Sequence, residues 1–193
     1  MTTTAQFPPA TLTGAASGPT VAVCAGRVLL LAGVCFGAAN LFQWSVVSGA
    51  SGLHPATLGL SWPLAVAIFF TGLFRLRRIG GEAARRVAGW SRMAVFSMIA
   101  AALALAAASG MTGDWSLMLW NSVATLGLYG LAWLTAFARA RRPGMALIGL
   151  VALGGAALLS TRIGTADQYM LQASTLALVA LLPGLWLALG RRL

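Results

Sequence analysis

Few side chains in this sequence could do chemistry, and most of them fall between apolar runs. The ionisable side chains include 13 arginines, three acidic residues and one histidine, and there is no lysine. His54, Asp114, Arg162, Asp167 and Tyr169 lie in three short polar segments. Two carboxylates and a histidine could hold a divalent cation, and a histidine can change its charge near neutral pH in an entry filter. We take these five residues as a candidate outer mouth; the alternative is that they are polar because connections face water.

Carboxamide side chains also occur inside the apolar runs. Asn40 and Gln43 are three residues apart, which places both on one face of a helix. Asn121 lies inside another run. A buried amide either lines a polar path or bonds to a neighbouring helix, and such interhelical bonds contribute about 0.5–2 kcal/mol. We interpret Asn40, Gln43 and Asn121 as a candidate substrate path, with structural hydrogen bonding as the alternative.

Several kinds of chemistry are disfavoured by this sequence. No acidic, basic or histidine residue lies deep inside an apolar run, which argues against a self-contained proton relay and against a haem held by paired histidines. Cys24 and Cys35 are 11 residues apart without a CxxC pattern, so they indicate neither a metal centre nor a dithiol relay. We expect no cofactor, no bound metal and no catalytic residue. An intramembrane enzyme that uses His54, Asp114 and Asp167 ranks third among the functions considered.

The elements that must position these residues are membrane-spanning helices. Apolar residues make up 59% of the 193-residue chain and charged residues only 8%, whereas soluble domains carry about 25% charged residues. A spanning helix needs roughly 20 mostly apolar residues. Six runs approach this length: 28–47, 58–74, 93–111, 117–137, 145–159 and 171–189. The sequence predicts an all-α membrane protein, a six-transmembrane-helix bundle over residues 26–193, with residues 1–25 as a flexible tail.

The arginines predict how this bundle is oriented. Twelve of the 13 arginines flank the same ends of the predicted helices, and Arg162 lies on the other side. By the positive-inside rule, both termini are expected in the cytoplasm. An excess of arginine over lysine is typical of a GC-rich genome, so we expect a multi-pass protein of a bacterial inner membrane.

The connection between the second and third runs predicts a cytoplasmic basic surface. Its members are Arg75, Arg77, Arg78, Arg85, Arg86 and Arg92. Glu82 precedes Arg86 by four residues, a spacing that favours a short surface helix. Basic residues at a membrane surface gain about 1 kcal/mol each against anionic lipid. We expect anionic lipids of the bilayer as partners, an acidic protein as an alternative, and no nucleic acid despite the net charge of +10.

Small residues indicate where the helices pack. Gly33 and Gly37 form a GxxxG pattern, and Gly149 and Gly155 lie in another small-residue run. Such residues let helix backbones approach closely in lipid. The surface that they meet is either another helix of this chain, a second membrane protein or a second copy. Repeated segments, 56–60 and 124–128 among them, indicate three related hairpins or a chance similarity between simple helices.

The function that this pattern favours is a non-enzymatic permeation or transport component for a small solute, either channel-like or as a transporter subunit. The alternative is an accessory or structural subunit of a larger membrane complex, whose small-residue faces bind other helices. The two hypotheses differ in their tests. Replacing Asn40 and Gln43 by leucine should abolish flux in the first, whereas Gly33→Leu or Gly37→Leu should release a partner in the second.

Overall fold

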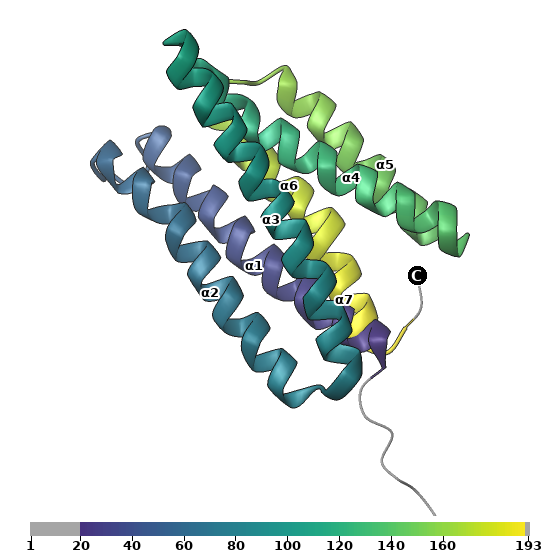
Figure 1. Ribbon diagram of the computed structural model, residues 1–193. Coiled ribbons are helices and arrows are strands. Elements are labelled where there is room, and N and C mark those ends of the chain that lie inside the picture. The colour runs from purple at the N-terminus through teal and green to yellow at the C-terminus, as the bar shows by residue number, and fades with distance from the viewer. Residues whose placement is uncertain (1–19, 192–193) are drawn as a thin grey trace, which may run out of the picture.

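The computed structural model describes residues 20–191, and every regular element in that range is helical (Figure 1). The α-helices are α1 (Val21–Val47), α2 (Leu58–Ile79), α3 (Gly81–Thr112), α4 (Asn121–Ala140), α5 (Pro143–Ser160), α6 (Ala166–Leu176) and α7 (Leu182–Ala188). Two 3₁₀ helices, η1 (Pro55–Thr57) and η2 (Trp115–Trp120), precede α2 and α4, and the π-helical segment η3 (Ala177–Leu181) joins α6 to α7. Residues 1–19 of the predicted tail lie outside the described residues, and residues 21–25 belong to α1.

Six helical segments of the described chain are long and apolar enough to cross a membrane. They are α1, η1 with α2, α3, η2 with α4, α5, and the continuous run α6–η3–α7. The predicted all-helical class with six apolar spans is thereby confirmed, as expected of a multi-pass membrane protein. The orientation of the termini and the relation between the hairpins stay predictions.

The connection between α2 and α3 differs most from its prediction. The prediction of a separate surface helix was wrong, because α2 continues to Ile79 and α3 begins at Gly81. The turn depends on two glycines, since Gly81 has a φ of 64° and a Cβ on Gly80 would overlap that of Ala84. Glu82 and Arg86 form their ion pair at 3.0 Å on the first turns of α3. The arginines therefore belong to the two helix ends, where their long side chains can reach the interface.

Helix α1 packs against more elements than any other helix of the described chain. It packs against α2, α3, α6, η3 and α7. The pairs α1–α3, α3–α4, α4–α5, α5–α6 and α6–α1 are all in contact, so these five helices form a closed ring of contacts. Helix α2 packs on α1 and α3. We call the end with the α2–α3 and α4–α5 turns the arginine end, and the opposite end the loop end.

Two apolar cores hold the bundle together. The first lies between α1, α2 and α3 and comprises Cys24, Val28, Cys35, Phe69, Leu73, Ala84, Val87, Ala88 and Val95. The second lies between α4, α5 and η3 and comprises Leu126, Ile148, Ala152, Ala156, Leu159 and Val179. The buried polar residues occupy the loop-end halves of their membrane-crossing segments: Asn40, Gln43, Ser61, Ser109, Ser122, Gln168, Gln172 and Thr175. Polar burial is thus concentrated at one end of the molecule.

Glycines set the register between α1 and the last span. A Cβ on Gly26 would overlap the backbone at Ala188, and a Cβ on Gly33 would lie 2.7 Å from the Leu181 side chain. Because the two helices run antiparallel, this register continues toward the loop end. It places Asn40 at the level of residues 173–174, within about one helical turn of Gln172.

Candidate functional site

Five side chains near the loop end carry a buried polar atom that has no hydrogen-bond partner within the described part of the chain. The atoms are Asn40 Oδ1, Gln43 Oε1, Ser109 Oγ, Asn121 Oδ1 and Gln172 Oε1, and we call these residues the polar set. They come from α1, α3, α4 and α6, four helices of the closed ring. A buried polar group without a partner costs about 1–3 kcal/mol. Five such groups therefore need an explanation beyond helix packing.

Helix α1 contributes two amides whose nitrogens are already used. Asn40 is fully buried, and its Nδ2 donates to the Phe36 carbonyl at 2.8 Å. Gln43 Nε2 donates to Ser61 Oγ at 3.1 Å, and this hydroxyl donates to the Leu58 carbonyl at 2.8 Å. Both donors are thus bonded while both carbonyl oxygens lack a partner. The pair can accept hydrogen bonds from a bound molecule.

Helix α6 contains two buried glutamines that behave differently. Gln168 Nε2 donates to the Leu119 carbonyl at 2.8 Å, and its Oε1 accepts from the Gly164 backbone at 3.0 Å. Gln172 lies one turn later on the same face and is also buried, but its Oε1 has no partner in residues 20–191. Gln168 therefore ties the loop end together, whereas Gln172 presents an available acceptor.

Helices α3 and α4 contribute Ser109 and Asn121 on either side of a turn. Gly113 ends α3 with a φ of 73°, and Asp114 caps η2 by accepting from the Ser116 backbone at 2.9 Å. Other hydroxyls of α3 donate to their own helix, as Ser97 does to the Met93 carbonyl at 2.9 Å. The Ser109 hydroxyl is fully buried and unpaired. Its position in an alanine-rich run gave no sequence signal, which is why Ser109 was missed.

The polar set is neutral and mainly accepts hydrogen bonds. Its unpaired atoms are four amide carbonyl oxygens and one hydroxyl. Such a set suits a solute that donates N–H or O–H bonds, whereas divalent cations prefer carboxylates among their oxygen ligands. Among residues 20–191, no three His, Cys, Asp or Glu residues gather in a way that could hold a metal ion.

The residues predicted at the outer mouth lie in or beside three separate connections. His54 Nδ1 accepts from the Ala56 backbone at 3.2 Å and caps η1. Hydrogen bonds from the Ser116 side chain and backbone hold the pKa of Asp114 below its ordinary value. Two further members, Arg162 and Asp167, form an exposed ion pair at 3.8 Å. The fifth, Tyr169, is half-buried on α6. Within the described chain, no hydrogen bond or ion pair joins any of the five to a different connection.

The run that carries Gln172 changes its helical geometry near its middle. Pro183 has no N–H, so the Val179 carbonyl four residues earlier loses its usual helical partner. The Tyr129 hydroxyl donates to this Val179 carbonyl at 2.9 Å. Just before the proline, the Leu182 N–H donates to the Ala177 carbonyl five residues earlier, which is a π-helical bond. π-Helical turns occur frequently at functional sites. Here the turn is fixed by a side chain of α4.

The glycines predicted to pack helices have unequal surroundings. A Cβ on Gly149 would lie 2.8 Å from the Leu134 side chain, and one on Gly155 would lie 2.5 Å from that of Thr175. With Gly33 against Leu181, three of the four predicted glycines therefore lie in contacts within this chain. Gly37 is buried. Apart from its two chain neighbours and the nearby backbone of α1 itself, no atom of the described structure lies within 4 Å of where its Cβ would be. This space lies one turn before Asn40.

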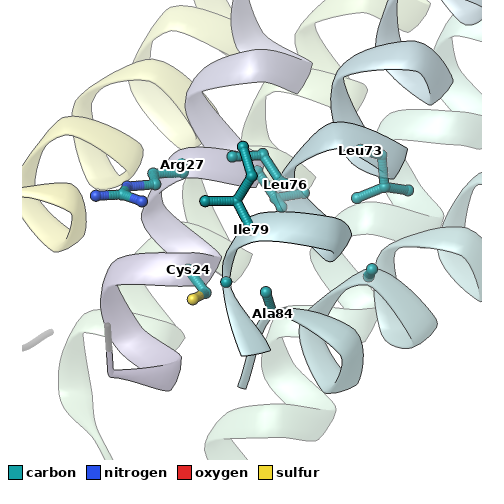
Figure 2. Close-up of a pocket in the computed structure, with 9 residues that line it drawn as sticks. Cys24, Arg27, Leu73, Leu76, Ile79 and Ala84 are labelled. Carbon is teal, nitrogen blue, oxygen red and sulfur yellow. The ribbon is translucent and has the colours of Figure 1, made fainter. Parts of the chain in front are cut away.

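A small cavity of about 70 Å³ lies at the arginine end (Figure 2). It is lined by Cys24, Arg27, Val28, Leu73, Leu76, Ile79, Gly80, Ala84 and Ala88. Figure 2 shows the Arg27 side chain extending away from Leu73 and Ala84. The lining includes no member of the polar set. The cavity is therefore a separate feature at the opposite end of the bundle.

Comparison with known protein families, with curated proteins and with solved structures gives no match to this chain.

Proposed function

We propose that this chain is a membrane-embedded permeation or transport component, and that its polar set takes up a small solute bearing N–H or O–H donors. The observation that supports the proposal is the group of five buried polar atoms without partners in residues 20–191. An amide that only packs helices uses both of its polar ends, as Gln168 does. The solute would supply the donors that the polar set lacks.

The arrangement favours passage through the loop end. A solute would first meet the exposed connections that hold the proposed outer mouth, and then the neutral acceptors of Asn40 and Gln172. The space beside Gly37 adjoins the Asn40 turn. Because the acceptors are uncharged, a bound solute can leave without separating an ion pair in the low-dielectric interior. With the arginine end in the cytoplasm, this entry would face the outside of the cell.

Proteoliposomes test the proposal. Vesicles with and without the protein are placed in hyperosmotic urea, glycerol or ammonium chloride, and reswelling is followed by light scattering. We expect faster entry of at least one of these solutes with the protein, and loss of the increase in Asn40→Leu and in Gln172→Leu. Ser97→Leu removes an exposed polar side chain and is the matched control, which should keep the wild-type rate. Equal rates for all three solutes with and without protein, or an unchanged rate in Asn40→Leu, would contradict the proposal.

A second candidate function, an accessory or structural subunit, is favoured by the exposure of α3. This 32-residue helix has five buried residues, and its Phe96, Leu103 and Met111 are exposed. Either lipid or a helix of another protein would cover this surface. Purification in mild detergent followed by mass spectrometry separates the two cases. A stoichiometric partner supports the subunit function, and a chain that purifies alone or with itself counts against it.

A further inference from the structure

An open groove of about 330 Å³ lies between α1 and α2. Its lining residues are Leu31, Ala67, Ile68, Thr71, Gly72 and Arg75. The α2 residues of the groove span about 12 Å from Ala67 to Arg75, at 1.5 Å per residue. The groove is therefore apolar along most of its length and carries a single cationic side chain, at its arginine end.

Small residues make this groove. Gly72 has no side chain, and a Cβ there would lie 2.6 Å from Leu31 Cδ2, so Leu31 packs directly over the α2 backbone. Ala67 is small and exposed, while Ile68 projects as an exposed apolar side chain. The Thr71 hydroxyl donates to the Ala67 carbonyl at 2.8 Å, which uses its donor within the helix. Among the side chains that line the groove, Arg75 is left as the donor for an anion.

We propose that the groove binds one anionic phospholipid, with an acyl chain along the apolar part and the phosphate on Arg75. The groove opens on the surface of a chain with six apolar spans, so phospholipid is the molecule that surrounds it. A guanidinium donates two parallel hydrogen bonds to a phosphate, and the exposed Arg75 lies at the end where a headgroup would be. Free phosphate would use Arg75 but not the apolar part. This proposal is independent of the polar set.

Native mass spectrometry tests the phosphate contact. The full chain, purified in mild detergent, is given equal amounts of phosphatidylglycerol and phosphatidylcholine. We expect the wild type to retain one phosphatidylglycerol, and Arg75→Gln to lower its retention about tenfold through loss of a charge-assisted bond. The matched control Arg77→Gln removes the same charge about 200° around the helix and should leave retention unchanged. Equal losses in the two variants would show attraction by surface charge alone and overturn the site.

A second pair of variants tests the acyl-chain contact. Ala67→Phe fills the groove without a change in charge, and we expect it to reduce the retention of phosphatidylglycerol. Leu64→Phe adds an aromatic ring to an exposed position one turn earlier and should have no effect. All four substituted residues are exposed, so the fold should persist, and the melting temperature of each variant checks this. Unchanged retention in Ala67→Phe, or a wild type that retains no lipid, would overturn the proposal.

Discussion

The two halves of α1 pack in opposite ways. At the arginine end, Gly26 and Gly33 bring α1 so close to the last span that a methyl group would not fit. At the loop end, Asn40 and Gln43 have buried acceptors without partners in the described chain, and Gly37 has open space beside it. Close contact between small residues stabilises helix association in lipid, whereas a buried acceptor without a partner destabilises it. The arginine-end half of α1 therefore packs closely against the last span, and the loop-end half carries two acceptors of the proposed binding site.

The largest effect is expected where the arginine-end half is disturbed. Gly26→Ala would place a methyl group in the backbone of α7 and lower the free energy of unfolding by about 3 kcal/mol. Gly37→Ala introduces the same methyl group where nothing would meet it, and a gain of about 0.5–1 kcal/mol from better helix propensity is expected. Unfolding in a detergent titration measures both values. Similar losses in the two variants would break the distinction between the halves of α1.

The paired glutamines of α6 extend the comparison to a second helix. Gln168→Leu leaves the Leu119 carbonyl and the Gly164 N–H without their partner, and should cost about 2 kcal/mol. Gln172→Leu removes an acceptor that already lacks a partner, so stability should stay equal or rise by about 1 kcal/mol. Thermal unfolding in detergent compares the two. If Gln172→Leu destabilises the protein as much as Gln168→Leu, Gln172 is a structural residue and the polar set loses a member.

A double-mutant cycle tests how the π-helical turn is held. Tyr129→Phe removes the donor to the Val179 carbonyl and should cost about 1–2 kcal/mol. In a Pro183→Ala background, the restored backbone N–H can bond that carbonyl, so the cost of Tyr129→Phe should shrink. The free energies of unfolding of the four proteins give the coupling between the two sites. A coupling of zero would show that the tyrosine hydroxyl does not replace the bond lost at the proline.

The smallest effect is expected in an exposed connection. The pKa of Asp114 is lowered by hydrogen bonds from Ser116, so the folded state favours the carboxylate. The Asp114 carboxylate therefore contributes to stability at neutral pH. This contribution is lost as the pH falls from about 4 through the lowered pKa of the folded state. Asp114→Asn should show a shallower loss of melting temperature over this acid range. An identical pH profile in the variant would show that this cap does not contribute.

Much of the fold could be predicted from the sequence, and the ends of the helices could not. Six apolar runs gave six spans because each run is bounded by charged or polar residues. The apolar runs underestimated the lengths of α2 and α3, because both helices continue through their arginines and meet at Gly80 and Gly81. A helix backbone does not end where its apolar stretch ends, since long basic side chains can reach water from inside the last turns.

The candidate site was predicted only in part. Asn40, Gln43 and Asn121 were singled out because amides are unusual inside apolar runs, and the structure adds Ser109 and Gln172. Gln172 lay at the edge of its run, yet the spacing of Gln168, Gln172 and Thr175 on one helix face was a signal that could have found it. Ser109 gave no such signal, because a serine in a helix normally bonds to its own backbone.

By itself, the sequence determined that the chain forms six apolar helices. The reason is local: hydrocarbon excludes charge and requires each span to satisfy its own backbone. Only the tertiary structure decided which buried polar atoms have partners. That depends on contacts between residues far apart in the chain, such as Gln168 with Leu119 and Tyr129 with Val179, 49 and 50 positions apart. Two glutamines four residues apart, identical in chemistry, are distinguished by what the packed helices bring next to each of them.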